Sequence, residues 1–487
     1  MVIESLKYKI LQQFGFAPTQ EQGQALDTFV SFLTDRDPQA VMILRGSAGT
    51  GKTSLSGAIV RTLLQIRQKV MLLAPTGRAA KVFSLGSGAP AYTIHRRIYR
   101  EKAFAGVDGQ FSLNDNLYTD TLFMVDEASM IANMGLGGTT FGSGCLLDDL
   151  VKFVYQGHND RLLLIGDKAQ LPPVGEEESP ALSASVMEGY GLKVYECDLN
   201  EVLRQSQSSG ILYNATLIRQ MITHDAVTGL PLIRFKGFAD IVMMPGAELV
   251  ESLGDSYHHV GMDETMVITR SNKRANIYNN GIRNMVLDRE EELSSGDMLM
   301  IVKNNYFWTE KEKKESGEGS AGAVPAFLAN GDRAKVLRVS NYIELYGFRF
   351  ATLLLQLPDY DDYEMQVTGM LDTLQSEAPA LTHEQQEELF RQVEEDYQHF
   401  VPLKADRMKS IRQDAYFNAL QIKYAYAVTC HKAQGGQWAH VYVDQGYMTD
   451  DMLTPDYIHW LYTAFTRATD KLFLVNWPKE QPCEPTD

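Results

Sequence analysis

One glycine-rich stretch carries the residue types and spacing best suited to chemistry. It reads Gly46-Ser-Ala-Gly-Thr-Gly-Lys52-Thr53 and fits the phosphate-binding pattern G-x-x-x-x-G-K-[ST] at every fixed position. Backbone N–H groups of such a loop close on phosphate oxygens, and the N-terminus of the following helix adds a positive dipole. Lys52 can reach the β- and γ-phosphates, while the Thr53 hydroxyl can bind Mg²⁺. The residues predicted to hold a nucleoside triphosphate are Gly46, Ser47, Ala48, Gly49, Thr50, Gly51, Lys52, Thr53 and Ser54.

Two carboxylates and an amide follow later apolar segments. Asp126 and Glu127 come directly after Thr121–Val125, a position that faces the phosphates in a P-loop fold. Asp126 is predicted to hold Mg²⁺ through water, and Glu127 to orient and deprotonate the attacking water. The alternative is a helix N-terminus, where acidic residues are favoured anyway. Gln170 stands where an amide can sense a γ-phosphate, although Asp167 and Gln170 are equally suited to building a turn.

Positioning these side chains requires strands that end at one edge of a sheet, and the sequence contains two α/β stretches. From about residue 20 to 210, short apolar segments alternate with helical ones. This alternation favours a mostly parallel, helix-covered sheet that binds ligands at the carboxyl ends of its strands. The second stretch starts near Ala226 and resumes after about Ile422. Predicted strands are Val41–Leu44, Val70–Leu73, Leu122–Val125 and Arg161–Ile165 in the first stretch, and Thr265–Thr269, Met298–Val302, Ala425–Thr429, Val441–Val443 and Leu472–Val475 in the second.

Two insertions interrupt the α/β pattern. Arg100–Asp120 is polar with turn signals and reads as a small hairpin that carries Phe104 and Phe111. The segment from Arg333 to about Pro358 is β-rich. Residues 358–420 match no pattern that predicts a role.

The length, composition and charge of the chain limit which class of protein it can be. A chain of 487 residues is long enough for two to four domains, and 44% hydrophobic residues is typical of a globular protein. No run of 18 apolar residues exists, so no membrane span is expected. The four cysteines match no zinc or disulfide spacing, so we expect a reducing cytoplasm. A net charge of −17 argues against a basic coat for nucleic acid but leaves a local basic groove open.

Several segments, in this order, resemble the motifs of superfamily 1 helicases. They are GSAGTGKT, VDEAS and GDKAQLPPV, followed by VTCHKAQG (428–435) and YTAFTRA (462–468), which resemble motifs V and VI. The wording of the motif V segment is typical of the RecD/Dda-like branch, and NGD (330–332) also looks like that branch. The likeness runs from about residue 18 to residue 477. It implies an α/β protein with two RecA-like P-loop domains in tandem around ATP and Mg²⁺.

The resemblance implies further residues at the ATP site. Gln22, within TQEQGQA (19–25), would read adenine; a glutamine on an exposed helix start is the alternative. Arg204 and Arg467 would contact the γ-phosphate, since a planar, always-charged donor fork suits charge that spreads over phosphate oxygens. An ordinary charge on a helix surface is the alternative for each. Gly435 would join the nucleotide-binding residues. The implied catalytic set is Lys52, Glu127, Gln170, Arg204 and Arg467.

Contacts with a nucleic-acid strand are implied at hydroxyl, imidazole and cationic side chains. These groups suit phosphate rather than base edges, so little sequence specificity is expected. A buried, satisfied histidine is the alternative for His95 and His431. Phe104 or Phe111 would be the wedge that splits base pairs, and packing of the hairpin onto its domain is an equal alternative. The implied contacts are Thr76, Arg78, His95, Phe104, Phe111, Thr429, His431 and Lys432.

The implied domains are a first RecA-like domain at 1–215 with the hairpin at about 100–120, a second at 216–332 and 422–487, and a β-rich SH3-like barrel at 333–421. The implied function is an ATP-dependent DNA helicase that translocates 5′ to 3′ on single-stranded DNA. Alternatives are an ATP-driven translocase or remodeller with little unwinding, and a nucleotide-gated binding protein. Expected partners are single-stranded and forked DNA together with single-strand-binding or replication and repair proteins; we expect a monomer and no membrane association.

Overall fold

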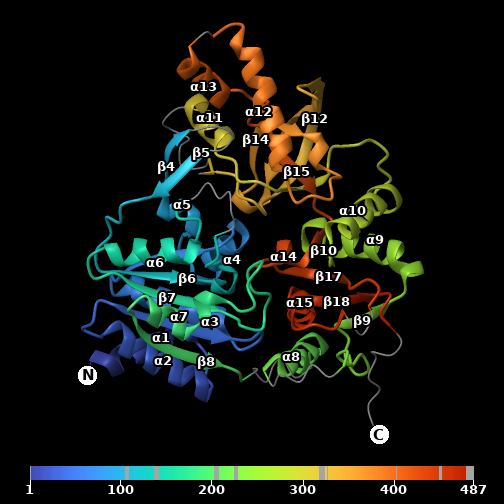
Figure 1. Ribbon diagram of the computed structural model, residues 1–487. Helices are drawn as coiled ribbons and strands as arrows, with labels where there is room; N and C mark the ends of the chain where they lie inside the picture. The colour runs from blue at the N-terminus through green and yellow to red at the C-terminus, as the bar shows by residue number, and fades with distance from the viewer. Residues whose placement is uncertain are drawn as a thin grey trace.

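A computed structural model of the chain describes residues 2–104, 109–135, 142–201, 208–223, 229–316, 324–325, 327–401, 403–448 and 452–478. Two α/β sheets lie side by side, and a β-barrel with a helical arm stands above them (Figure 1). In the described part of the chain, no helix is both long and apolar enough to cross a bilayer.

The first sheet has six parallel strands in the order β3-β2-β6-β7-β1-β8. Alternate residues of β1 enter different cores, since Val41 and Ile43 pack on one face while Met42 and Leu44 pack on the other. One face is covered by α1 (Val2–Phe14), α2 (Gln20–Leu33), α3 (Lys52–Gln65) and α4 (Gly77–Ser87), the other by α5 (Ile94–Ile98), α6 (Leu146–Gln156) and α7 (Ala184–Gly189). The strands are β1 (Ala40–Gly46), β2 (Lys69–Ala74), β3 (Ala91–Thr93), β6 (Thr121–Val125), β7 (Arg161–Gly166) and β8 (Lys193–Leu199).

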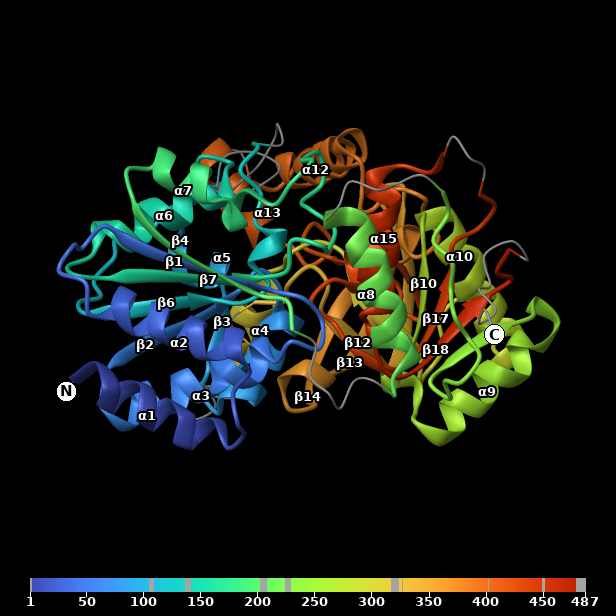
Figure 2. The same cartoon turned by 90° about the horizontal axis from the view of Figure 1, so that it is seen from below.

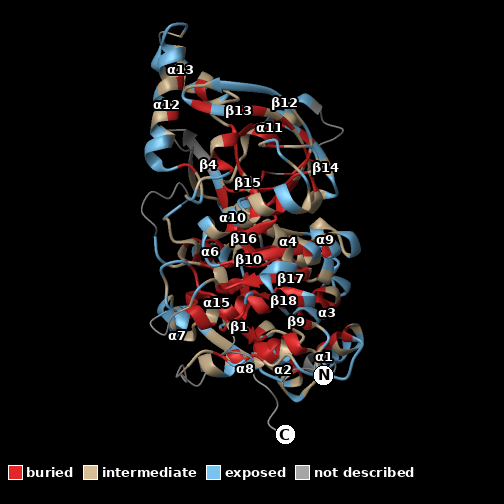
Figure 3. Cartoon of the chain, turned by 90° about the vertical axis from the view of Figure 1, so that its right-hand side faces the viewer, coloured by how far each residue is buried: buried red, intermediate tan, exposed pale blue. Residues whose placement is uncertain are grey.

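The second sheet has five parallel strands in the order β16-β10-β17-β18-β9. These are β9 (Ile241–Met244), β10 (Thr265–Thr269), β16 (Ala427–Thr429), β17 (Trp438–Asp444) and β18 (Ala468–Val475). Its helices are α8 (Gly210–Thr223), α9 (Leu249–His259), α10 (Asn272–Gly281), α14 (Cys430–Ala433) and α15 (Pro455–Phe465). Helices α8 and α15 pack together, and Figure 2 shows α8 on the side of the second sheet that faces the first. Strands β1, β6 and β7 of the first sheet and β10 of the second are buried along their whole length (Figure 3).

The β-rich segment forms a closed barrel of five strands. They are β11 (Met298–Ile301), β12 (Arg333–Leu345), β13 (Phe348–Leu357), β14 (Tyr363–Met370) and β15 (Leu420–Tyr424). The prediction that Met298–Val302 belongs to the second α/β sheet is wrong, because β11 pairs antiparallel with β12 and β15. A short, fully buried apolar strand has the same pattern in a barrel as in a parallel sheet, so periodicity could not separate the two environments. The barrel therefore extends beyond both ends of the predicted 333–421 segment.

Two smaller units project from these bodies. The predicted hairpin is present as β4 (Tyr99–Phe104) and β5 (Gly109–Leu113), which pair antiparallel. Helix α11 (Phe307–Ser316) follows β11, and α12 (His383–Gln398) and α13 (Lys404–Arg412) are inserted between β14 and β15. We call α12 and α13 the arm. A capping box of Thr382 and Gln385 starts α12, and Leu389 and Val393 bury its apolar face.

Candidate functional site

The glycine-rich loop joins buried β1 to the N-terminus of α3. Gly49 and Gly51 have φ of 77° and 81°, in the left-handed region that glycine tolerates. A side chain at Gly46 would come within 2.8 Å of Lys52 Cγ, so the loop has no room for one there. Lys52 Nζ donates to the Gly46 and Ser47 carbonyls, and Thr53 and Ser54 are exposed. The predicted strand, loop and helix are thus confirmed, and the loop has the backbone form that encloses phosphate.

Asp126 and Glu127 lie at the carboxyl end of β6, in line with the end of β7. Burial, reinforced by the charge of Glu127, raises the pKa of Asp126 to about 7. Glu127 has a left-handed backbone, with φ of 52°, which a non-glycine residue adopts at some cost. The donor set that Thr53 and Asp126 offer is a hydroxyl and a carboxylate, and oxygen ligands of this kind suit Mg²⁺.

The turn after β7 carries Asp167 and Gln170, both buried. Asp167 does build the turn, since its Oδ1 accepts from Ala169 N at 3.0 Å. The Gln170 side-chain oxygen is buried and finds no hydrogen-bond partner in the described part of the chain. A buried amide oxygen without a partner is rare, and a bound nucleotide or water would supply one.

Side chains of the second sheet reach the phosphate loop of the first. On α15, the Tyr462 hydroxyl accepts from Ala48 N at 2.9 Å and donates to Asp167 Oδ2 at 2.7 Å. On α8, Arg219 donates to the Ser47 hydroxyl. Neither residue is among those predicted from the sequence. Tyr462 stands within the motif VI segment that was recognised, whereas no signal in the sequence singles out Arg219.

More contacts join the two sheets at the turn after β7. Leu171 N donates to the Thr463 hydroxyl at 2.7 Å, and the Gln434 side chain donates to the Leu171 carbonyl at 2.8 Å. His459 bonds the Ala169 carbonyl at 2.9 Å. Segments 428–435 and 462–468, far apart from this turn in the chain, therefore meet it directly.

The two predicted γ-phosphate arginines differ in what the structure says of them. Arg204 lies outside the described residues. Arg467 is buried, and its guanidinium donates to the Thr463 and Gly436 carbonyls and to the Thr466 hydroxyl, each at 3.1 Å. All three acceptors belong to the second sheet or its helices, so a phosphate contact by Arg467 would require some of these bonds to break. Its role at the phosphate stays a prediction.

Gln22 is buried against the phosphate loop rather than exposed. Its amide nitrogen donates to the Thr50 carbonyl at 2.9 Å, and its oxygen accepts from Thr19 N at 3.0 Å as part of a capping box. The side chain thus ties the start of α2 to the loop. Adenine recognition by Gln22 remains a prediction.

The predicted strand contacts lie on both α/β bodies. Thr76 caps α4, and Arg78 reaches across to the second sheet, donating to the Gln437 carbonyl at 2.6 Å and lying 4.6 Å from the Trp438 ring centroid. Gly435 lies against the same α4, because a side chain there would come within 3.1 Å of the Thr76 hydroxyl. Arg78 therefore joins the two bodies, whatever else it contacts.

The remaining predicted strand contacts are divided between the two α/β bodies. His95 on α5 is half-buried, and burial lowers its pKa to about 4, so it is neutral at pH 7. Thr429 and His431 belong to the β16–α14 junction; Thr429 is half-buried and His431 is exposed. Lys432 donates to the Asn330 side chain, and burial lowers its pKa to about 8.

The two hairpin aromatics also differ. The Phe104 side chain lies outside the described residues. Phe111 packs on the core of the first sheet and lies 4.9 Å, between ring centroids, from Tyr306 in the segment after β11. The packing alternative thus describes its observed contacts, and the wedge role stays a prediction.

Buried Asp332, in the NGD segment, lies close to the start of α4 at Gly77. A side chain on Gly77 would come within 2.4 Å of its Oδ1. Tyr360 donates to Asp332 Oδ2 at 2.6 Å, and burial raises the pKa of this carboxyl to about 7. The NGD segment therefore joins the barrel to the first sheet, a contact that the sequence pattern did not predict.

Two parallel α/β sheets, with a phosphate loop on the first that side chains from the second contact, define a tandem RecA-like P-loop ATPase. Family models agree with each half: an AAA domain matches residues 17–229, and a UvrD-like helicase C-terminal domain matches residues 424–475. These matches support a P-loop ATPase of the superfamily 1 helicase kind, similar to RecD- and Dda-like proteins.

Individual relatives are distant. The ATP-dependent RecD2 DNA helicase of Deinococcus radiodurans is 30% identical over 157 residues, which cover 32% of this chain and 18% of that protein. The ATP-dependent DNA helicase dda of Enterobacteria phage T4 is 25% identical over 267 residues, covering 53% and 55%. The chain thus spans less than two thirds of either relative. A Bacteroides Pif1 helicase structure aligns over 96% of this chain and 95% of that one, at 13% identity and a TM-score of 0.46, a likeness too remote to support an argument about function.

Proposed function

We propose that this protein is an ATP-dependent DNA helicase that translocates 5′ to 3′ along single-stranded DNA and separates duplex strands. The observation that carries the proposal is the contact of Tyr462 and Arg219, both from the second α/β body, with the phosphate loop of the first. A nucleotide bound in this loop would lie within reach of side chains from both bodies. Its binding and hydrolysis would therefore change how the bodies sit against each other.

The chemistry is phosphoryl transfer to water, in which positioning and electrostatics supply most of the catalysis. Lys52 lies on the loop carbonyls and would move to the β- and γ-phosphates. Glu127, at the end of β6, would orient the attacking water and accept its proton, and the unpartnered Gln170 oxygen would help to hold that water. Thr53 and Asp126 would hold Mg²⁺, which neutralises charge on the phosphate oxygens.

Movement would follow from strand contacts divided between the bodies. Thr76 and His95 belong to the first, and Thr429, His431 and Lys432 to the second. If ATP closes the bodies and hydrolysis releases them, each body can grip the strand while the other advances. The 5′-to-3′ direction rests on the likeness of segment 428–435 to the RecD/Dda-like wording, and strand separation on the hairpin that stands beside the barrel.

The test is ATP-dependent unwinding of two matched duplexes, one with a 5′ single-stranded tail and one with a 3′ tail. Unwinding of the 5′-tailed duplex alone is expected, and Glu127→Gln should abolish it while nucleotide binding persists. Unwinding of the 3′-tailed duplex alone would overturn the direction. DNA-stimulated hydrolysis without unwinding of either would favour a translocase, and the hairpin would then have no separating role.

A further inference from the structure

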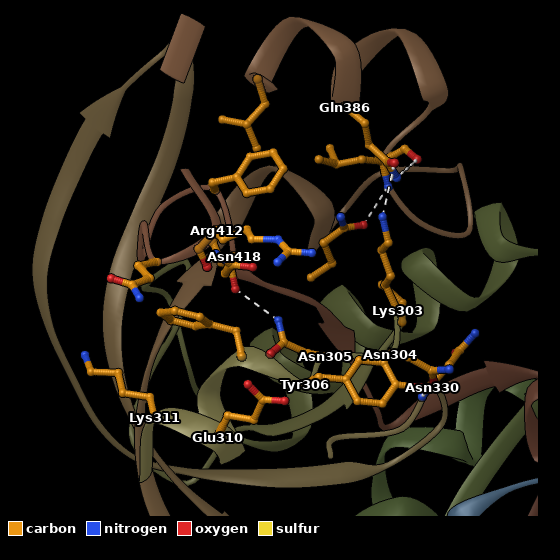
Figure 4. A pocket seen from close by; sticks show the side chains of 18 of the residues that line it. Lys303, Asn304, Asn305, Tyr306, Glu310, Lys311, Asn330, Gln386, Arg412 and Asn418 are labelled. Atoms are coloured by element: carbon orange, nitrogen blue, oxygen red, sulfur yellow. Dashed lines mark hydrogen bonds between the residues drawn. The ribbon is translucent and has the colours of Figure 1, made fainter. Parts of the chain in front are cut away.

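A large pocket lies away from the phosphate loop, where the hairpin, the barrel and the arm meet. Its volume is about 880 Å³, towards the upper end of the range for ligand sites. The wall comes from Phe111 of the hairpin, the segment from Val302 into α11, and the arm with the residues that follow it (Figure 4). The hairpin, the barrel and the arm thus contribute to one cavity.

The charge of the pocket is opposite to that of the whole protein. Its lining includes Lys303, Lys311, Lys314, Lys409 and Arg412 against Glu310 and Glu315, in a chain whose net charge is −17. Lys314 and Lys409 are exposed, and neither forms an ion pair within the described part of the chain. The lining thus carries more cations than carboxylates, and this excess of positive charge favours a polyanionic ligand.

Hydrogen bonds and ring contacts fix the walls. Lys303 donates to the Gln386 side chain at 3.1 Å, and the Asn305 amide donates to the Asn418 carbonyl at 3.0 Å (Figure 4). Tyr306 lies 4.9 Å from Phe111 and 4.7 Å from Phe327, measured between ring centroids. The hairpin, barrel and arm are therefore held together at this point, and the cations stand on supported elements.

The pocket adjoins one of the predicted strand contacts. Lys432, an implied backbone contact, donates to the Asn330 side chain, and Asn330 also lines the pocket. A single strand bound at Lys432 would thus have the pocket beside it.

We propose that this pocket binds a second segment of the same single-stranded nucleic acid that the helicase motifs contact, through its phosphates. The inference rests on the proposed function and gives the arm, which matched no sequence pattern, a role as an outlying strand-binding element. Because the arm belongs to the barrel and Phe111 to the hairpin, the strand would be held beside the hairpin.

The experiment compares equilibrium binding of two oligothymidylates by fluorescence anisotropy at several salt concentrations. The short one is the shortest that still stimulates ATP hydrolysis by the wild-type protein, and the long one is at least twelve nucleotides longer. The test variant is Lys314→Gln with Lys409→Gln. The matched control is Lys9→Gln with Lys404→Gln, which makes the same charge change at exposed sites outside the pocket lining, one of them on α13.

We expect the test variant to lose affinity for the long oligonucleotide and to keep its affinity for the short one. Each single-strand phosphate contact contributes about 0.7 to the slope of log K against log salt, so two lost contacts lower the slope by about 1.4. If the test variant and the wild-type protein bind the long oligonucleotide equally at 1 M salt, that slope change corresponds to roughly 25-fold weaker binding by the variant at 0.1 M. Stimulation of hydrolysis by the short oligonucleotide should stay at the wild-type level, which also verifies folding, and the control variant should bind both as wild type does.

Other results would overturn the inference. Equal loss for both lengths would place these lysines on the main strand path, and no loss for either would exclude the pocket from strand binding. A wild-type protein that binds neither oligonucleotide would overturn the proposed function itself, before any variant is compared.

Discussion

Replacing Tyr462 by phenylalanine tests how the second α/β body senses the phosphate loop. The Tyr462 hydroxyl accepts from Ala48 N at 2.9 Å, and that N–H belongs to the loop whose amides bind phosphate. The tyrosine and a phosphate therefore compete for the same donor. Tyr462→Phe removes the competitor and keeps the ring that packs in the core of the second sheet.

The size of the effect follows from one neutral hydrogen bond. Such a bond contributes about 0.5–1.5 kcal/mol net, so a non-hydrolysable ATP analogue should bind roughly 2- to 12-fold more tightly to the variant. At the same time Asp167 loses the donor at its Oδ2, which weakens the contact between the bodies. DNA stimulation of hydrolysis should therefore fall even though nucleotide binding improves.

The assay is titration with a fluorescent ATP analogue, together with ATPase rates with and without single-stranded DNA. Tyr457→Phe is the matched control, since Tyr457 lies on the same helix and its hydroxyl donates to Gln445 Oε1 at 2.6 Å within the second body. The control should leave nucleotide affinity unchanged. Weaker nucleotide binding by Tyr462→Phe would refute the competition and show that the hydroxyl supports the bound phosphate instead.

Three further outcomes are expected. Glu127→Gln should lower the hydrolysis rate by about 10²- to 10⁴-fold with nucleotide affinity retained, because a positioned general base contributes that much; single-turnover hydrolysis measures it. If Arg219 senses the bound phosphate through its contact with Ser47, Arg219→Ala should lower DNA-stimulated ATP turnover by tenfold or more, and Arg219→Lys should lower it by less. An unchanged rate would show that Arg219 only packs the two bodies together. Lys432 should lose its charge as pH rises through about 8, so single-strand affinity should fall up to about tenfold between pH 7 and pH 9. Lys432→Arg should remove that dependence, whereas Lys423→Arg should keep it, since Lys423 is held by the Thr373 and Ser376 carbonyls.

Strands such as β6 and β7 were predictable because each is an almost continuous apolar run that leads directly into glycine or acidic residues, whereas β3, β8 and β9 were not predicted. Thr265–Thr269 was predicted with the observed bounds, and the phosphate loop was placed correctly between β1 and α3. Met298–Val302 was misassigned, because the partners of a buried strand are chosen by the whole fold rather than by its own residues. The arm could not be given a role for a related reason: its lysines acquire meaning only beside α11 and Phe111, which are distant in sequence.

The types of residue at the site could be predicted from the sequence, but the hydrogen bonds between the two α/β bodies could not. Motif wording pointed to Lys52, Asp126 and Glu127, since their chemistry is local to single strands and turns. The pairing of Ser47 with Arg219 arises from the packing of α8 against α15, and no short pattern encodes such a contact. Arg467, which looks like a phosphate ligand in sequence, bonds three acceptors of its own half.

The place of the arm in the barrel has a consequence for how such chains can diversify. Strands β14 and β15 run parallel, and parallel neighbours cannot be joined by a tight turn, because the chain must first travel back along the barrel. The arm fills that obligatory crossover. Related chains are therefore free to lengthen, shorten or replace the helices between residues 371 and 419 while the barrel stays closed. The crossover itself cannot be removed, so this connection is a place where the barrel tolerates an inserted module.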